Sequence, residues 1–286
     1  MGLNSFVRRI ALHILSQPKA QVKVSLQQVN YNGILSGKNI VITGGSRGIG
    51  FAMAQKFVSE GAVVLITGRN EEHLQNAKNA LGRNADYIVC DNSAMDNGDW
   101  LVEQCKLKLG SIYSFVLNAG VSLHERSFLN VTPEGFEKQF NTNLKANYFI
   151  AQSFLKYKLQ QETDGNLLFL SSETAGKSID IPYGLTKAAI NSLVGGLARR
   201  VYQKGIRINA IAPGVTLTDM TLRGKLNIES DLATNSSAGR WLLPEEIAEV
   251  ACFLLSDASK CITGEVIYCD AGSHLKINGT ESEYSF

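Results

Sequence analysis

From Lys38 onward, short apolar runs alternate with longer segments whose apolar residues recur at helical spacing. Such alternation is typical of strands joined by crossover helices, which together form a parallel sheet covered on both faces. We therefore expect a single α/β domain with a doubly wound, seven-stranded parallel sheet and helices on both faces. The runs that we expect to be strands are Asn39–Thr43, Ala62–Thr67, Asp86–Cys90, Ile112–Asn118, Asn166–Leu170, Ile206–Ile211 and Glu265–Cys269.

Composition excludes several classes of protein. The formal net charge is +2 and no basic stripe interleaved with aromatic residues occurs, so the electrostatic footprint of nucleic-acid binding is missing. The 5 cysteines are scattered without metal-ligand spacing, so we expect no metal site and a reduced, cytoplasmic setting. The sequence lacks the run of about 18 apolar residues that a membrane-spanning helix needs, so we expect no integral membrane segment.

The first 36 residues differ from the rest of the chain. Apolar residues recur at helical spacing between Leu3 and Leu15, and no acidic residue precedes Glu60. Three interpretations compete: an arm that packs on the body or on a sister subunit, a helix on a membrane surface, and a mitochondrial-type targeting segment. We favour the amphipathic arm, because the apolar stripe is short and few basic residues accompany it.

The chain accordingly divides into an N-terminal arm (1–36), a main domain (37–272) and a C-terminal tail (273–286). The longest stretch without clear strand or helix signals, 218–240, is polar and rich in small residues. Long irregular stretches in compact domains are often functional, so we expect this one to be a substrate lid.

The first expected strand leads into a glycine-rich turn, and a helical segment follows it. A helix N-terminus offers unpaired N–H groups and a partial positive charge to a pyrophosphate, and glycines let the backbone approach it closely. A tight turn without a ligand would look similar, and the Gly-x-x-x-Gly-x-Gly spacing departs from the commoner Gly-x-Gly-x-x-Gly fingerprint. We expect a dinucleotide cofactor to bind here, at Gly44, Ser46, Arg47, Gly48, Ile49 and Gly50.

The end of the second strand indicates which dinucleotide binds. Many such folds place a carboxylate there for the adenine ribose hydroxyls, but this strand ends in Thr67-Gly68-Arg69. No acid repels a 2′-phosphate there, and Arg47 and Arg69 offer two guanidinium groups for it, unless both simply face solvent. We expect NADP(H) to be preferred, with NAD(H) possible. Asp91 is placed to receive the adenine amino group, and its neighbour Asn92 is counted with the cofactor-binding residues.

Tyr183 and Lys187 are four residues apart at the start of a segment with helical periodicity. This spacing places both side chains on one face of a helix, with their Cβ atoms about 6 Å apart. A free phenol has a pKa of about 10, and a neighbouring ammonium lowers it, which makes the phenol a better proton carrier at neutral pH. An exposed helical pair without a function would show the same spacing. The catalytic interpretation therefore depends on the other residues expected beside the pair.

Those residues follow other strands at the same sheet edge. Ser171 and Ser172 follow the fifth strand, where a hydroxyl can bind a substrate oxygen, and counting along the strand favours Ser172. Asn118-Ala119-Gly120 ends the fourth strand in a small-residue turn against which a cofactor can lie. Asn143, in the helical segment that begins near Pro133, can bridge the lysine to bulk water as a proton relay.

Taken together, these residues resemble the motifs of the short-chain dehydrogenase/reductase family, from Gly37 to Gly272. The resemblance rests on Thr43–Gly50, Asp91, Asn118–Gly120, Asn143, Ser171-Ser172, Tyr183, Lys187, Pro213-Gly214, Thr218 and Asp270–Gly272. It implies a Rossmann-type sheet, an NAD(P)(H) cofactor, a catalytic tetrad of Asn143, Ser172, Tyr183 and Lys187, and a homodimer or homotetramer. The interval of 11 residues from Ser172 to Tyr183 is shorter than is common in the family.

We therefore expect an oxidoreductase that transfers a hydride between the nicotinamide and a carbonyl or secondary alcohol carbon of a small substrate. Ser172 would bind the carbonyl oxygen, Tyr183 would donate the proton, and Lys187 would orient the ribose and lower the tyrosine pKa. Thr218 and the backbone near Val215 are expected to hold the carboxamide of the cofactor, and Pro213 and Gly214 are counted with the cofactor-binding residues.

Two other functions compete with this one: a non-catalytic dinucleotide-binding sensor or scaffold, and a nucleotide-sugar epimerase or dehydratase. The glycine spacing and the short substrate region disfavour the second. Polar loop residues suggest a polar substrate such as a sugar or polyol, although solvated loops would look the same: His124, Arg126, Glu173, Lys177 and Asp180. The substrate and the direction of the reaction stay open.

Overall fold

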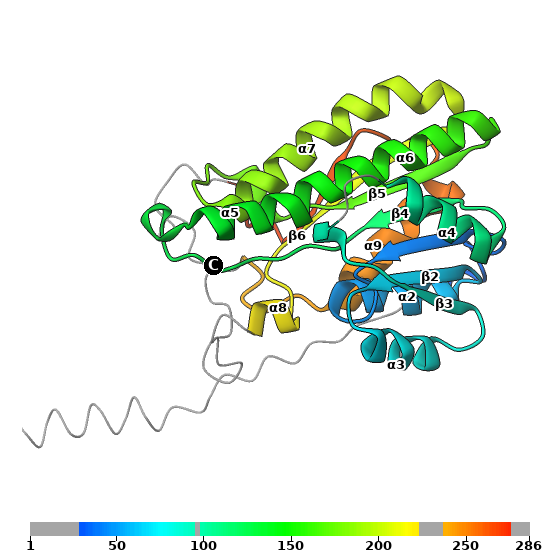
Figure 1. Cartoon of the computed structure of the whole chain (residues 1–286), viewed down its shortest axis with the longest axis horizontal. Helices are drawn as coiled ribbons and strands as arrows, with labels where there is room; N and C mark the ends of the chain where they lie inside the picture. The colour runs from blue at the N-terminus through cyan, green and yellow to red at the C-terminus, as the bar shows by residue number, and fades with distance from the viewer. Residues whose placement is uncertain (1–28, 95–97, 223–236, 276–286) are drawn as a thin grey trace, which may run out of the picture.

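The computed structural model describes residues 29–94, 98–222 and 237–275. Its centre is a parallel sheet of seven strands in the order β3-β2-β1-β4-β5-β6-β7, which confirms the predicted architecture (Figure 1). The strands are β1 (Asn39–Thr43), β2 (Val63–Gly68), β3 (Ala85–Val89), β4 (Ser114–Leu117), β5 (Gly165–Leu170), β6 (Ile206–Pro213) and β7 (Val266–Cys269). β1 has the predicted bounds, and the other strands differ from the prediction by one or two residues, because pairing with their neighbours decides where each ladder ends.

Helices cover both faces of the sheet. The helices are α2 (Gly48–Ser59), α3 (Glu71–Leu81), α4 (Asp99–Leu109), α5 (Pro133–Phe140), α6 (Ala146–Gln161), α7 (Pro182–Val201), α8 (Asp219–Leu222) and α9 (Pro244–Leu255). Short helical turns are η1 (Asn92–Ala94), η2 (Phe128–Asn130), η3 (Asn141–Lys145), η4 (Glu173–Gly176), η5 (Tyr202–Lys204) and η6 (Asp257–Ser259).

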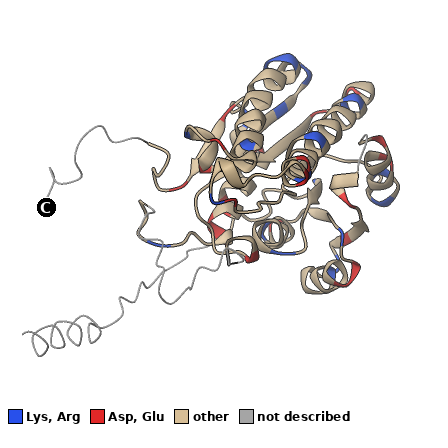
Figure 2. Cartoon of the chain, turned by 60° about the vertical axis from the view of Figure 1, so that its left-hand side comes forward, with Lys and Arg blue, Asp and Glu red and all other residues tan. Residues whose placement is uncertain are grey.

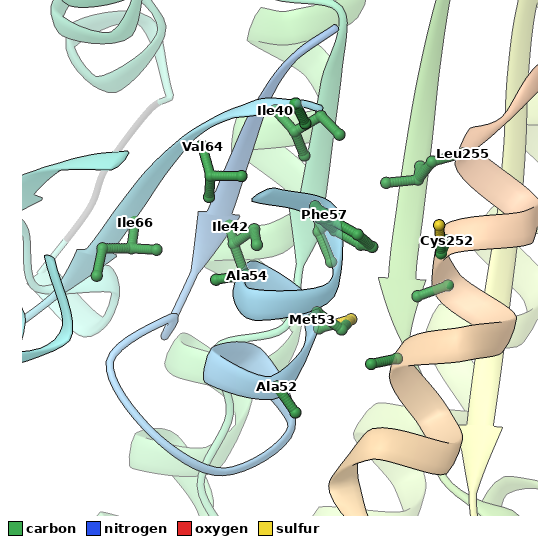
Figure 3. Close-up of a cluster of buried hydrophobic side chains, with 14 of the residues drawn as sticks. Ile40, Ile42, Ala52, Met53, Ala54, Phe57, Val64, Ile66, Cys252 and Leu255 are labelled. Carbon is green, nitrogen blue, oxygen red and sulfur yellow. The ribbon is translucent and has the colours of Figure 1, made fainter. Parts of the chain in front are cut away.

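Two apolar cores lie on opposite faces of the sheet. Ile40 and Ile42 of β1 belong to the core with α2, α3 and α9, whereas Val41 between them belongs to the core with α4, α6 and α7. Successive side chains of a strand point to opposite faces, so a strand that is buried on both sides is apolar throughout. Figure 3 shows the first core, in which strand residues and α2 face α9: Ile40, Ile42, Val64, Ile66, Met53, Phe57, Cys252 and Leu255.

The strand order places the expected ligand crevice at the carboxyl edge of the sheet. β1 pairs with β2 on one side and with β4 on the other, so the chain leaves β1 in one direction and returns on the opposite side. Connections that diverge in this way leave a gap outside the strand ends, which is where open α/β sheets bind their ligands. The ends of β1 and β4, at Thr43 and Leu117, border this gap.

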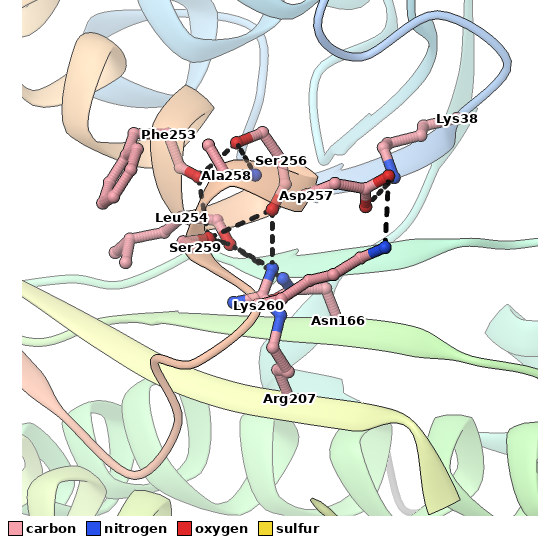
Figure 4. Close-up of polar contacts among 10 residues, drawn as sticks. All are labelled: Lys38, Asn166, Arg207, Phe253, Leu254, Ser256, Asp257, Ala258, Ser259 and Lys260. Atoms are coloured by element: carbon pink, nitrogen blue, oxygen red, sulfur yellow. Dashed lines mark hydrogen bonds and ion pairs between the residues drawn. The ribbon is translucent and has the colours of Figure 1, made fainter.

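The opposite, amino edge is closed by a structural polar cluster (Figure 4). The buried guanidinium of Arg207 donates hydrogen bonds to the carbonyls of Leu254 (2.7 Å) and Ser256 (3.0 Å) at the end of α9. The amide of Asn166 shares the Leu254 carbonyl at 2.9 Å. Lys38 forms an ion pair with Asp257 at 3.1 Å. These contacts hold α9 against the starts of β5 and β6.

The described end of the N-terminal arm lies on the body. The buried carboxylate of Glu60 accepts hydrogen bonds from the backbone N–H groups of Tyr31 (3.0 Å) and Gly33 (3.1 Å), and Leu35 is fully buried. The amphipathic stretch predicted within 1–28 lies outside the described residues, as do 223–236 of the expected lid and 276–286 of the tail. In the described part of the chain no helix is long and apolar enough to cross a membrane. Figure 2 marks both basic and acidic residues along the ribbon, and the long helices α6 and α7 carry only basic ones.

Candidate active site

The glycine turn after β1 presents the N-terminus of α2 to the crevice. Gly44 and Gly48 have φ values of 65° and 54°, which L side chains rarely adopt. Arg47 stands at the N-cap with extended backbone, no described side chain caps the first turn, and no acidic residue lies in it. The free N–H groups and the helix dipole therefore fit a diphosphate at this position.

The other residues predicted around this turn lie close to it. The hydroxyl of Ser46 is 3.7 Å from where a Cβ would stand on Gly68 at the end of β2, and Ile49 packs against the core. Arg69 follows β2 on the exposed surface. The guanidinium of Arg47 forms an ion pair with Asp219 of α8 at 3.2 Å.

Asn118 holds the turn in place. Its amide donates hydrogen bonds to the carbonyls of Thr43 (2.9 Å) and Gly44 (3.0 Å). In return, the hydroxyl of Thr43 accepts the backbone N–H groups of Asn118 and Ala119, both at 3.0 Å. The ends of β1 and β4 are thus locked together. Sequence reasoning missed this role of Thr43 and Asn118, because the pairing becomes visible only once β1 and β4 are neighbours.

Near the ends of β2 and β3, two buried polar atoms have no hydrogen-bond partner among the described residues. Asp91 accepts hydrogen bonds from the N–H (2.9 Å) and the hydroxyl (2.7 Å) of Ser93. Asn92 is buried, and within the described residues its Nδ2 has no hydrogen-bond partner, nor does the hydroxyl of buried Thr67. Because buried polar groups are normally paired, these atoms fit a site that a polar ligand completes.

Tyr183 and Lys187 lie in the first two turns of α7. The ammonium of Lys187 is 5.6 Å from the centroid of the Tyr183 ring and donates a hydrogen bond to the carbonyl of Leu170, at the end of β5, at 2.6 Å. Burial lowers the pKa of Lys187, which is 4% exposed, to about 8.

The pKa of Tyr183 differs from our expectation. We expected the ammonium of Lys187 to lower it, but in the structure burial raises the pKa of Tyr183, a hydrogen bond with Ser172 opposes the rise, and the charge of Glu173 adds to it. The reason is that a poorly hydrated phenolate is costly, and this cost outweighs the neighbouring groups.

The structure separates the two serines after β5. The hydroxyl of Ser171 bonds to Asn191 (2.5 Å) and to the carbonyl of Lys187 (3.4 Å), so it is directed into α7. The hydroxyl of Ser172 instead bonds to Tyr183 and accepts hydrogen bonds from the N–H (3.3 Å) and hydroxyl (3.0 Å) of Thr174. The structure therefore brings Ser172, and not Ser171, to the tyrosine.

Asn143 lies in η3, a π-helical turn between α5 and α6 that the sequence did not predict. It is fully buried, and its side chain bonds both to the N–H (2.8 Å) and to the carbonyl (2.9 Å) of Val121. A Cβ on Gly120 would be 3.3 Å from Oδ1 of Asn143 and 3.6 Å from Nζ of Lys187, so both side chains border this glycine. π-Helical turns are frequent at functional sites. Four residues on, Asn147 donates to the Asn143 carbonyl at 2.8 Å.

The segment after β6 reaches back to the glycine turn. Pro213 ends the strand, the N–H of Gly214 donates to Cys269 at 2.9 Å, and the carbonyl of Val215 accepts the N–H of Leu242 at 2.9 Å. A Cβ on Gly48 would be 3.3 Å from the methyl carbon of Thr218. Thr218 and the glycine turn therefore border the same part of the crevice.

Sequence reasoning missed an aromatic pair that faces the loop after Ser172. Tyr268 of β7 stacks on His274 with ring centroids 3.8 Å apart, and His274 is 2.8 Å from the carboxylate of Asp270. A Cβ on Gly176 would lie 2.9 Å from the Tyr268 hydroxyl. Of the predicted polar loop residues, His124 contacts the carbonyl of Met220 at 3.0 Å. Lys177 pairs with Glu173 at 3.5 Å. In the described ranges no cluster of three or more His, Cys, Asp or Glu side chains could hold a metal ion.

With this geometry established, comparison with known proteins decides the family. A family model described as enoyl-(acyl carrier protein) reductase matches residues 44–274. The chain belongs to the short-chain dehydrogenase/reductase family. It is 34% identical to the 3-oxoacyl-[acyl-carrier-protein] reductase of Chlamydia trachomatis, over 84% of this chain and 99% of that one. It is 33% identical to the L-rhamnose 1-dehydrogenase (NADP(+)) of Thermoplasma acidophilum, over 84% of this chain and 98% of that one.

The fold of this short-chain dehydrogenase/reductase is also similar to solved structures. The 3-ketoacyl-(acyl-carrier-protein) reductase of Brucella melitensis, complexed with NADH, superposes with a TM-score of 0.77 at 27% identity, over 84% of this chain and 100% of that one. The chain is therefore an oxidoreductase that acts on CH–OH or C=O groups of small substrates and uses NAD(P).

Proposed function

We propose that this short-chain dehydrogenase/reductase transfers a hydride between NADP(H), in preference to NAD(H), and a carbonyl or secondary alcohol carbon, with Tyr183 as the proton carrier. The observation that carries the proposal is the meeting of the Ser172 hydroxyl, the Tyr183 phenol and the Lys187 ammonium beside Gly120. These groups come from the end of β5 and the start of α7, next to the turn after β4. A binding-only protein does not need a phenol and an ammonium on one helix beside a hydroxyl.

The preference for NADP(H) rests on charge at the adenine end. Arg69 follows β2 on the surface, Arg47 stands at the start of α2, and no carboxylate ends β2. Two guanidinium groups favour a 2′-phosphate through charge-assisted hydrogen bonds, whereas the ribose hydroxyls of NAD(H) lack the usual acidic partner. The diphosphate would be held by the free N–H groups of α2 and the adenine by the pocket that contains Asp91 and Asn92.

The bound cofactor supplies the hydride, and the protein supplies the proton and the binding site for the oxygen. Ser172 donates a hydrogen bond to the substrate oxygen and stabilises the charge that develops on it. Tyr183 donates its phenolic proton to that oxygen, and because burial raises its pKa, the phenol is protonated at neutral pH. Lys187 orients the ribose, and its lowered pKa makes it able to return a proton to the tyrosine.

Asn143 completes the proposed proton path. Its side chain is held by Val121 and lies beside the glycine that Lys187 also borders. We propose that it links the lysine to bulk water. Thr218, Val215, Gly214 and Pro213 would hold the carboxamide end of the cofactor, because they connect the end of β6 to the glycine turn.

The remaining proposals concern assembly and surroundings. We propose a cytoplasmic homodimer or homotetramer that packs through the helices carrying Asn143 and Tyr183. In the described protomer α6 exposes Tyr148 and Leu159, and α7 exposes Leu185, which is the apolar surface such an interface needs. Light scattering tests the assembly directly.

We also propose that the stretch 218–240 is a substrate lid and that 1–36 is an arm on the main domain.

A cofactor-consumption screen tests the enzymatic proposal. Ketones, aldehydes, polyols and acyl thioesters are offered to the protein with NADPH and NADH, and alcohols with the oxidised forms. We expect turnover with at least one class, faster with NADP(H), and a loss of turnover by orders of magnitude in Tyr183→Phe, which still binds NADPH. Unchanged turnover in Tyr183→Phe refutes the role of the tyrosine, and NADPH binding without turnover on any class favours the sensor or scaffold.

A further inference from the structure

An ion pair joins the glycine turn to the segment after β6. Nη1 of Arg47, at the N-cap of α2, lies 3.2 Å from Oδ2 of Asp219, the first residue of α8. The two residues are 172 positions apart in the sequence. Both side chains are about half exposed, at 47% and 59%.

Other contacts fix where α8 lies relative to the crevice. Thr218, directly before α8, packs against the position of Gly48, and the carbonyl of Met220 within α8 is 3.0 Å from Nε2 of His124, in the loop after β4. α8 therefore contacts both the glycine turn and the loop after β4. It lies beyond the carboxyl edge of the sheet (Figure 1). Asp219 is held on the side of the glycine turn.

In this position the Asp219 carboxylate and the 2′-phosphate of NADP(H) would both bind the guanidinium of Arg47. Arg47 is one of the two guanidinium groups that we propose for the 2′-phosphate of NADP(H), and Asp219 occupies one of its donors. An exposed ion pair of one carboxylate is weak, and a phosphate with nearly two negative charges is the stronger partner. The carboxylate leaves fewer of the Arg47 donors to the phosphate and repels it at short range, where salt screens little. NAD(H) has no such phosphate and can bind without breaking the pair.

We propose that Asp219 is a specificity-determining residue that competes with the 2′-phosphate of NADP(H) for Arg47. This inference rests on the proposed preference for NADP(H). Asp219 lowers the affinity for NADP(H) and leaves that for NAD(H) unaffected, so it makes the discrimination between the two cofactors smaller than the arginines alone would produce.

Binding of the two reduced cofactors, followed by nicotinamide fluorescence on the full-length protein, tests the inference without a known substrate. Asp219→Asn keeps the size of the side chain and removes its charge. We expect it to tighten NADPH binding about three- to tenfold and to leave the NADH dissociation constant within about twofold. The matched control is Asp164→Asn, which makes the same change in net charge at an exposed residue just before β5, at the opposite edge of the sheet. It should change neither constant.

Arg47→Gln separates this inference from the proposal beneath it. In the Arg47→Gln background there is no guanidinium to compete for, so Asp219→Asn should gain clearly less NADPH affinity than it does in the wild type. An equal gain in both backgrounds, or equal gains for NADPH and NADH, overturns the competition. If Arg47→Gln weakens NADPH binding but Asp219→Asn has no effect, the inference is wrong while the cofactor preference stands. If Arg47→Gln and Asp219→Asn both leave NADPH binding unchanged, the role of Arg47 is wrong and the inference falls with it.

Discussion

Lys187 is buried and Tyr183 is half-buried, and the pKa values of the two side chains move in opposite directions. The ammonium of Lys187 lies 5.6 Å from the tyrosine ring centroid, burial lowers its pKa to about 8, and burial also raises the pKa of Tyr183. The same cause acts on both, because poor hydration disfavours an ammonium as well as a phenolate. At neutral pH the pair is therefore a protonated phenol beside an ammonium that gives up its proton readily.

The lowered pKa of Lys187 predicts how stability depends on pH. Between pH 8 and pH 10.5 the unfolded chain keeps this proton while the folded chain releases it, so the cost of burying the charge is present below pH 8 and is relieved above it. We expect the free energy of unfolding of the wild type, relative to Lys187→Met, to rise by about 2 kcal/mol from pH 7 to pH 9.5. Urea denaturation without cofactor measures this, and parallel pH profiles would contradict it.

The two adjacent serines should respond differently to the same substitution. Ser172→Ala removes the hydroxyl that bonds to Tyr183, and we expect turnover to fall about 100-fold or more. Ser171→Ala leaves Asn191 without its partner inside α7, so we expect a loss of about 1 to 2 kcal/mol in the free energy of unfolding and nearly normal turnover. Steady-state rates and urea denaturation of both variants, measured side by side, decide the matter. A larger loss of turnover in Ser171→Ala reverses the assignment.

Asn143 should matter for both folding and turnover. Asn143→Ala leaves the N–H and carbonyl of half-buried Val121 without their partner, and we expect a loss of about 2 to 3 kcal/mol in stability with at least about tenfold slower turnover. Thr186→Val is the milder control, because it removes the hydroxyl 3.3 Å from the Asn143 amide and leaves Val121 paired. If both variants turn over at the wild-type rate, Asn143 has no part in the proton path.

A buried ion pair should anchor the described end of the N-terminal arm. Burial alone would raise the pKa of Glu60, but the N–H of Tyr31 and the ammonium of Lys56, 3.0 Å away, hold that pKa below its usual value. We expect Glu60→Gln to lower the free energy of unfolding by about 3 kcal/mol at pH 7, because the buried ammonium of Lys56 loses one of its two carboxylates. The loss is limited because Glu249 still pairs with Lys56.

The pH dependence of this anchor has a definite sign. A carboxyl group with a lowered pKa stabilises the fold above its unfolded pKa, and this contribution is lost as pH falls through the folded value. The difference in the free energy of unfolding between the wild type and Glu60→Gln should therefore become smaller in acid. Glu249→Gln is the control. It should lose less free energy of unfolding than Glu60→Gln, because Glu60 still accepts its backbone hydrogen bonds in this variant. A gap that is constant from pH 7 to pH 3 would contradict the anchor.

Much of the fold could be predicted from the sequence because strand and helix periodicities are local. Both ends of β1 were predicted correctly. The glycines of the turn after it, which accept positive φ, indicate where α2 begins. The π-helical turn at Asn143 could not be predicted, because its register shift depends on what Val121 and Thr186 offer from other elements. Nor could the stacking of Tyr268 on His274, which leaves no periodic signal.

The sequence by itself determined which residues reach the carboxyl edge of the sheet. In a parallel sheet every strand ends at this edge, so a residue that directly follows a strand lies there. Counting along β5 already favoured Ser172 over Ser171 as the partner of Tyr183. Only the tertiary structure decided that Asn118 meets Thr43 and that Asp219 meets Arg47. Those two contacts depend on packing between segments far apart in the chain, on which local sequence patterns contain no information.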